Sequence, residues 1–166
     1  LDIRAIYAHV QTGQPLATWP GAEERVAPED VLFDDVDVLV PAAVENTITG
    51  GNAERVRASL IIEGANGPLT TEADDLLSER GVTVIPDILA NAGGVATSGL
   101  EMSQNSMRLS WTREEVDQRL HGIMKAIHKT CVDASEAFGT PGNYVNGANI
   151  GGFLKVADAM MDQGLV

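Results

Sequence analysis

Three short motifs contain the residues of this chain that are best suited to binding a ligand. They are Pro41-Ala42-Ala43, Glu63-Gly-Ala-Asn66-Gly-Pro68 and Asn91-Ala-Gly-Gly94-Val95, and each follows an apolar run typical of a buried strand. An asparagine amide offers both donors and an acceptor, while glycine and alanine let a ligand approach the backbone. Ligands of open α/β sheets bind beyond the carboxyl ends of the strands. The motifs therefore predict one half of a nucleotide-binding site.

The polar residues in and after these motifs have binding interpretations, and for Asn66 and Ser98 a simpler structural role is also possible. Asn66 lies in a Gly/Pro turn, where an asparagine usually bonds its own backbone. Asn91 precedes two glycines that open a predicted helix, and free amides at a helix start attract polar or negative groups. Ser98 follows on that helix and could reach a substrate carboxylate, or it could bond the carbonyl four residues back. The matched positions of the two asparagines support binding about as well as the local roles, and the alternatives stay open.

The other reactive side chains predict neither a metal site nor a nucleophile. His9, His121 and His128 share no face with an acid or with the single cysteine, Cys131. Cys131 lies in an amphipathic helix, so we expect a core residue there. A lone cysteine allows no internal disulfide, which fits a reducing cytoplasm.

Composition excludes several classes of partner. The 166 residues are 44% apolar and 21% charged, which is typical of one globular domain with a core. Eleven basic and 24 acidic residues give a net charge of -13, which repels nucleic acid and anionic membranes.

No apolar stretch approaches the roughly 20 residues that span a bilayer. Because the chain begins at Leu1 inside a predicted helix, we expect a piece of a longer polypeptide.

The pattern of apolar residues predicts an α/β fold. Strands are expected at 36–40, 59–62 and 82–85, with helices at 2–11, at 50–57 and from Thr70 or Thr71 to just before Gly81. Alternating strands and helices indicate a parallel sheet with right-handed crossovers. Continuous Val and Ile runs predict strands that are buried on both faces.

The second half of the chain is predicted to be helical. Helices are expected at 92–109, after the capping box Thr112-Arg-Glu-Glu115, and at 146–163. The middle helix should pack through a stripe on the sheet or on another helix, namely Val116, Leu120, Ile123, Ile127, Cys131 and Ala134. The last helix is predicted to bury Ile150, Phe153, Leu154, Ala157 and Met161.

Longer stretches around the motifs resemble a known family. They are Pro41-Ala-Ala with Glu45-Asn46, residues 62–68 with Thr71-Glu-Ala-Asp74, residues 85–98, Ser98-Gly-Leu-Glu-Met-Ser-Gln-Asn105 and residues 144–161. These stretches are similar to the amino-acid dehydrogenase superfamily, and within it to the glutamate dehydrogenases. The resemblance covers nearly the whole chain, and the last two stretches are similar to hexameric bacterial enzymes, many of which depend on NADP.

The resemblance implies a reaction and a set of contacts. The reaction is the reversible NAD(P)-dependent oxidative deamination of L-glutamate to 2-oxoglutarate and ammonia, with NADP favoured over NAD. Asn66 and Asn91 would contact the nicotinamide and its ribose, and the backbone at Ala42 and Ala43 would line the cofactor cleft. Val95 and Ser98 would face the glutamate. The sequence departs from the common pattern at turn or rim positions, namely Thr47, Leu69 and Thr71.

The resemblance also implies that this chain is incomplete. The catalytic Lys and Asp of the family, and its glycine fingerprint, lie in regions that this sequence does not contain, and the lysines present are in predicted helices of the second half (Lys125, Lys129 and Lys155). We therefore expect no catalytic residue here and no activity of the isolated chain. Within one domain, residues 1–90 would form the second half of a Rossmann-like nucleotide-binding domain, and residues 91–166 the helices that pack on the sheet and toward the missing substrate domain.

The full-length protein is expected to be a homo-oligomer, a hexamer by the resemblance, located in the cytoplasm. Its partners would be glutamate or 2-oxoglutarate and ammonium, with no nucleic acid, membrane or metal. The alternative hypothesis is a free-standing, non-catalytic module that binds a nucleotide or assembles with other proteins.

Overall fold

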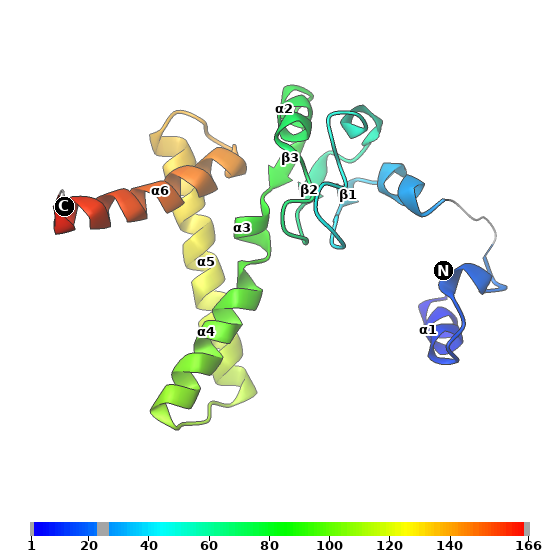
Figure 1. Cartoon of the computed structure of the whole chain (residues 1–166), viewed down its shortest axis with the longest axis horizontal. Coiled ribbons are helices and arrows are strands. Elements are labelled where there is room, and N and C mark those ends of the chain that lie inside the picture. Colours follow the sequence, from blue (N-terminus) through cyan, green and yellow to red (C-terminus); the bar gives the residue numbers. More distant parts are fainter. Residues whose placement is uncertain (1, 23–26, 165–166) are drawn as a thin grey trace. The chain divides into compact units, whose positions relative to one another are not determined.

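The computed structural model describes residues 2–22 and 27–164, which form two compact units divided between Asp34 and Asp35. The first unit contains α1 (Ile3–Gln11) and two short 3-10 helices, η1 (Leu16–Thr18) and η2 (Pro28–Phe33) (Figure 1). The Asp2 side chain caps α1 by accepting the N–H of Ala5 at 3.0 Å. The predicted helix at 2–11 is therefore confirmed.

The second unit is built on three parallel strands, β1 (Val38–Leu39), β2 (Leu60–Ile62) and β3 (Thr83–Ile85). They lie in the order β1-β2-β3, with Leu39 opposite Ile61 and Ile61 opposite Val84. This arrangement confirms the predicted parallel α/β sheet. Each strand lies within its predicted range but is shorter than expected.

Helix α2 (Thr71–Glu79) covers one face of this sheet together with the 3-10 turn η3 (Ala53–Arg55). The Thr70 hydroxyl caps α2, as predicted, by accepting the N–H of Ala73 at 3.3 Å. The Arg80 guanidinium donates to the carbonyls of Ala53 and Val56 at 2.8 and 2.7 Å. The helix predicted at 50–57 is wrong in extent, because Gly50-Gly51 opens that segment and glycine disfavours a helix.

The core of the second unit lies between the sheet, η3 and α2. Its most deeply buried side chains are Ile48, Val56, Ile61, Pro68 and Leu77. The prediction that the strands are buried on both faces is wrong for both edge strands: in β1 Leu39 is 8% exposed but Val38 is 46% exposed, and in β3 Thr83 is exposed beside the buried Val84. β1 lies at the edge of the sheet, and successive side chains of a strand point to opposite faces.

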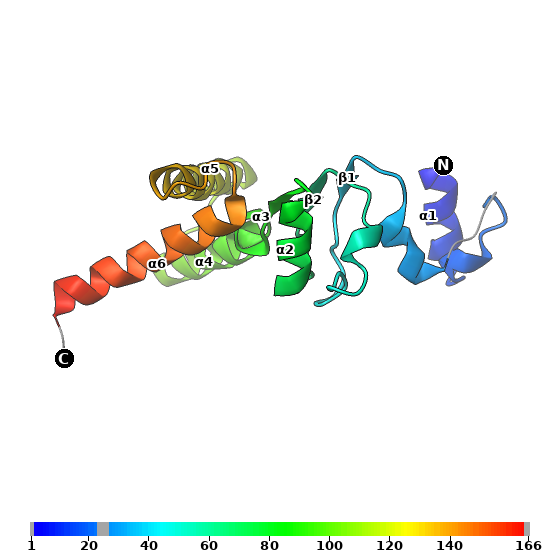
Figure 2. The same cartoon turned by 90° about the horizontal axis from the view of Figure 1, so that it is seen from above.

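Four helices complete the second unit: α3 (Asp87–Ala90), α4 (Ala92–Met107), α5 (Arg113–Ala137) and α6 (Tyr144–Gln163). α5 packs against both α4 and α6, and α6 also contacts β3 (Figures 1 and 2). The capping box at Thr112 and Glu115 is present as predicted. Among the described residues, no helix combines the length and apolar character needed to cross a membrane.

The predicted stripe on α5 packs on the neighbouring helices. Cys131 and Ala134 are buried, and the four other residues of the stripe are half-buried. At the centre of the α5·α6 contact, a Cβ on Gly147 would clash with the carbonyl oxygen of Cys131 and lie 3.0 Å from its Sγ. The absence of a side chain at Gly147 therefore lets the two helices approach closely.

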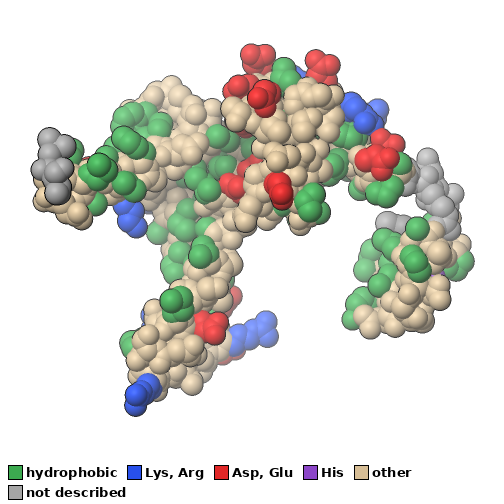
Figure 3. Space-filling model, viewed as in Figure 1, with side chains coloured by type: hydrophobic (Ala, Val, Ile, Leu, Met, Phe, Trp, Pro, Cys, Tyr) green, Lys and Arg blue, Asp and Glu red, His purple; other side chains and the backbone are tan. Residues whose placement is uncertain are grey.

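The burial predicted for α6 is wrong. Phe153 is 69% exposed and Met161 79%, while Leu154 is also exposed and Ile150 and Ala157 are half-buried. Figure 3 shows hydrophobic side chains on the surface of α6 (left). The face that meets α5 is formed by small residues such as Gly147 and Gly151, so the bulky residues lie on the other faces of the helix.

Candidate functional site

The carboxyl ends of β1 and β2 are joined directly by backbone hydrogen bonds. The carbonyl of Pro41 accepts the N–H groups of Gly64 and Ala65 at 3.1 and 2.9 Å. A Cβ on Gly64 would lie 2.9 Å from the Cβ of Ala42, so a side chain there would require the two segments to separate. The first two motifs of the sequence are thus in contact.

The loop that follows β1 is hydrogen-bonded to the second motif, which follows β2. Asn46 donates its N–H to the carbonyl of Gly67 at 2.8 Å, and Ile48 donates to the carbonyl of Pro68 at 2.9 Å. Asn46 and Gly67 both have positive φ, at 52° and 55°, a conformation that glycine adopts freely and that asparagine tolerates better than most residues. These bonds fix the loop after β1 against the turn after β2.

Asn66 and Asn91, which follow β2 and β3, meet through their side chains. The Nδ2 of Asn91 donates to the Oδ1 of Asn66 at 2.7 Å, and it also lies 3.4 Å from the carbonyl of Gly64 and 3.5 Å from that of Ala65. The Asn66 side chain therefore links two motifs, which differs from the local turn role considered above.

A cavity of about 580 Å³ lies at these strand ends; we call it the strand-end cleft. It is lined by Ala43, Val44, Glu45, Gly64, Ala65, Asn66, Asn91 and Val95. Four of the six predicted binding residues are among them. Sequence reasoning missed Val44 and Glu45, although both continue the first motif directly.

The two remaining predicted residues lie outside that lining. Ala42 packs against Gly64 beside the cleft. The Ser98 hydroxyl donates to the carbonyl of Gly94 at 3.4 Å, which is the helix-interior role considered as its alternative. Ser98 is nonetheless exposed, and it lies one helical turn after Val95, which does line the cleft.

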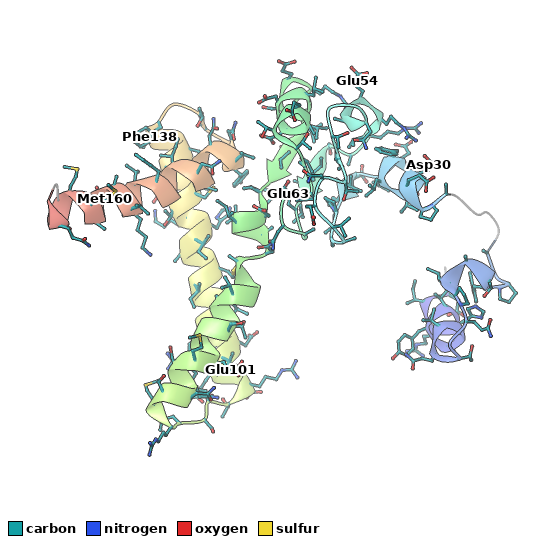
Figure 4. All side chains as sticks on the ribbon, in the orientation of Figure 1. Asp30, Glu54, Glu63, Glu101, Phe138 and Met160 are labelled. Atoms are coloured by element: carbon teal, nitrogen blue, oxygen red, sulfur yellow. The ribbon has the colours of Figure 1, made fainter. Side chains whose placement is uncertain are left out.

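Sequence reasoning did not identify two carboxylates that lie close to the asparagine segments, those of Glu63 and Asp87. Glu63 is only 7% exposed, and its Oε2 accepts the N–H of Asp87 at 2.8 Å. Figure 4 labels Glu63 beside α3. Burial raises the pKa of Glu63, the nearby Asp87 and Asp74 carboxylates raise it further, and N–H groups of Asp87 and Leu69 oppose the shift. The sequence signal that could have identified Glu63 is its position directly after an apolar strand.

The lining of the cleft is suited to hydrogen bonding rather than to proton transfer. It offers two amide side chains, backbone groups and one carboxylate, that of Glu45. Within residues 2–22 and 27–164, no group of three or more His, Cys, Asp or Glu side chains is placed to hold a metal ion. Cys131 is buried as predicted, and burial raises the pKa of its thiol.

Parallel strands with a cleft at their carboxyl ends define an α/β protein of the open-sheet type, in which ligands bind at that edge. Comparison with known proteins identifies the family. Residues 1–164 match the glutamate/leucine/phenylalanine/valine dehydrogenase family, and the chain belongs to it.

Individual relatives agree with this assignment. The chain is 48% identical over 146 residues to the NADP-specific glutamate dehydrogenase of Giardia intestinalis, covering 86% of the chain and 32% of that protein. It is 44% identical over 164 residues to NADP-specific glutamate dehydrogenase A1 of Halobacterium salinarum, and this match covers 99% of the chain and 39% of that protein. The solved structure of the hetero-hexameric glutamate dehydrogenase from Thermus thermophilus (Leu bound form) matches with a TM-score of 0.85 at 29% identity. This match covers 100% of the present chain and 38% of the solved one. The chain thus spans about a third of the length of these relatives.

Proposed function

We propose that this chain is part of an NADP-dependent glutamate dehydrogenase, in which the strand-end cleft holds the nicotinamide side of the coenzyme. The names of the two relatives above support the reaction and the choice of NADP. When bound, the nicotinamide ring would exchange a hydride with the α-carbon of glutamate. The role of this chain is then to hold and orient the coenzyme and the substrate.

The observation that carries the proposal is the Asn66–Asn91 pair at the rim of the cleft. Their mutual bond uses the Asn66 carbonyl oxygen and one hydrogen of the Asn91 amide. It leaves the Asn66 NH₂ group as a donor and the Asn91 carbonyl oxygen as an acceptor. A ring carboxamide and ribose hydroxyls need this combination of donor and acceptor, so the pair fits a nicotinamide nucleoside.

The remaining predicted contacts are assigned by the same proposal. The backbone at Ala42 and Ala43 would lie along the coenzyme, where small side chains leave room for a ring. Val95 would face the aliphatic part of glutamate, and the Ser98 hydroxyl would bind its α-carboxylate. The bond from Ser98 to Gly94 is long at 3.4 Å, so exchanging it for a charged acceptor is favourable.

We place the proton-transferring groups outside this chain. Asparagine amides do not titrate, and the described lysines lie on α5 and α6, away from the lining of the cleft. Lys129, for example, forms an ion pair with Asp133 at 2.6 Å. The isolated chain is therefore proposed to be inactive, and the complete protein to be a cytoplasmic homo-hexamer acting on glutamate, 2-oxoglutarate and ammonium.

The test uses the complete reading frame that contains this sequence. Purified protein with 2-oxoglutarate and ammonium should oxidise NADPH faster than NADH. Asn66→Ala and Asn91→Ala should each raise the KM for NADPH about tenfold, as expected for losing a coenzyme hydrogen bond. Gln118→Ala, which removes an exposed amide from α5, is the matched control and should leave KM unchanged.

Three results would contradict parts of the proposal. Unchanged KM in both asparagine variants would remove the cleft from the coenzyme site. A complete protein that binds the dinucleotide but never turns over glutamate would favour the non-catalytic binding module. Turnover by the isolated 166-residue chain at a rate near that of the complete protein would overturn its proposed inactivity.

A further inference from the structure

The two carboxylates behind the cleft join the segments that carry the asparagines. Asp87 is the first residue of α3, and its Oδ2 accepts the N–H of Gly67 at 2.8 Å. Gly67 directly follows Asn66 in the chain. On the other side, the N–H of Asn91 donates to the carbonyl of Asp87 at 2.9 Å. The bond to Asn91 is a main-chain bond of the helix, so the Asp87 carboxylate anchors the turn after Asn66 to the helix that leads to Asn91.

Glu63 extends the connection from the end of β2. Its carboxylate accepts the N–H of Asp87 at 2.8 Å, and the backbone N–H of Leu69 also acts to lower the pKa of Glu63. The Asp87 carboxylate in turn accepts the N–H of Ile88 at 2.6 Å. The Asp87 carboxylate thus receives two backbone N–H groups, one on each oxygen, which a side chain with a single acceptor oxygen cannot match in the same geometry.

We propose that Glu63 and Asp87 are positioning residues that set the separation of Asn66 and Asn91 at the cleft. Neither carboxylate lines the cleft, so both act through the asparagines. The inference rests on the proposed function, because it assumes that the pair binds the nicotinamide side of the coenzyme. A binding pair must be held close to its working geometry, and charge-assisted bonds to rigid backbone do this better than one amide–amide bond.

The first experiment measures coenzyme binding directly. NADPH fluorescence is titrated with the complete protein carrying Asp87→Ala or Asp87→Asn. The alanine variant should bind about tenfold more weakly, because the turn after Asn66 loses its anchor. The asparagine variant keeps one acceptor oxygen and should recover part of that loss. Asp75→Ala, an exposed acid on α2, removes the same charge and should bind as wild type does.

A double-mutant cycle separates positioning from a general loss of stability. If Asp87 acts through Asn66, adding Asp87→Ala to Asn66→Ala should weaken NADPH binding less than twofold further. A structural role unrelated to the pair would give additive losses. Additive losses, or normal binding in Asp87→Ala, would overturn the inference. If Asp87→Ala does not fold, the same cycle is run with Asp87→Asn.

The cycle also distinguishes the two proposals. A wild-type complete protein without NADPH binding would defeat the proposed function and leave nothing for the carboxylates to position. A wild-type protein that binds NADPH and loses affinity in Asn66→Ala, but shows no change in either Asp87 variant, would defeat only the positioning role.

Discussion

At the strand-end cleft, the buried polar side chains have hydrogen-bond partners within the chain, whereas on helix α6 large apolar side chains are left exposed. At the cleft, backbone bonds join the motifs and two carboxylates receive backbone N–H groups; in the described part of the chain, no buried side-chain polar atom lacks a partner. On α6, close packing is confined to the small residues that face α5. Large apolar side chains on its other faces are exposed, namely Phe153, Val156, Met160 and Met161.

The cleft depends on neighbouring segments of this chain, whereas burial of the α6 side chains requires another surface. The cleft is built from the ends of neighbouring strands and one helix start, and the bonds that join its three motifs all lie within residues 35–91. The apolar faces of α6 need a further surface before they are buried. Contiguous exposed apolar groups of this kind mark interaction surfaces. Substitutions at the two places should therefore behave differently.

The largest expected contrast is between Leu77 in the core beneath the sheet and Phe153 on α6. Leu77→Ala should lower the free energy of unfolding of the 166-residue chain by about 3 kcal/mol, because it leaves a cavity. Phe153→Ala should change it by less than about 0.5 kcal/mol, because the ring is 69% exposed. Urea denaturation measures both.

The same two variants also test whether the exposed face of α6 is covered. A loss of more than about 2 kcal/mol for Phe153→Ala in the isolated chain would show that α6 is already covered, on the scale of buried aromatic truncations. If Phe153→Ala is harmless in the isolated chain but costly in the complete protein, the exposed face of α6 is an internal contact of the whole protein.

A second contrast lies within α6 itself. Gly147→Ala places a Cβ against the backbone of Cys131, so the α5·α6 contact must open, at a cost of about 2 kcal/mol. Gly152→Ala on the same helix meets nothing within 4 Å and should instead stabilise the protein by about 0.5 kcal/mol. Thermal unfolding of both variants checks the difference, and equal midpoints would contradict the close approach at Gly147.

The strand-end motifs were predictable because the rule behind them is geometric. Parallel strands end at one edge, so residues that directly follow β2 and β3 must be neighbours, as Asn66 and Asn91 are. Capping residues such as Thr70 and Thr112 were equally predictable, since the signal and the bond lie within four residues. Sequence reasoning therefore located the sheet and the rim of the cleft.

Two kinds of feature could not be predicted. The bond between Glu63 and the N–H of Asp87 spans 24 positions and has no local pattern, so it emerges only when the strands are placed side by side. For α6, helical spacing identifies residues that can be buried, such as Phe153, but not the surface that would bury them. The chain places small residues at the contact and leaves the large ones exposed.

A third contrast tests the close contact at the strand ends. Gly64→Ala brings a Cβ to 2.9 Å from the Cβ of Ala42, and the loop after β1 must shift, at a cost of about 1 kcal/mol. Gly51→Ala is the matched control, because Gly51 also lies outside the helices and strands and its added Cβ would meet only the Thr49 Oγ1 at 3.7 Å, an ordinary contact. Urea denaturation should separate the two variants, and a Gly64→Ala protein as stable as the Gly51→Ala protein would mean that the loop after β1 shifts at no cost.

The smallest expected effect is a pH dependence that arises from Glu63, behind the cleft. Burial raises the pKa of Glu63 above its ordinary value of 4.5, so between the two values the folded protein holds a proton that the unfolded chain has released. Stability must then fall as the pH rises through this window. Glu63→Gln cannot titrate, so wild type should lose stability relative to this variant as the pH rises from 4.5 and then run parallel to it. Urea denaturation at several pH values measures the difference. A relative gain by wild type over that range would mean that the N–H groups of Asp87 and Leu69 outweigh burial.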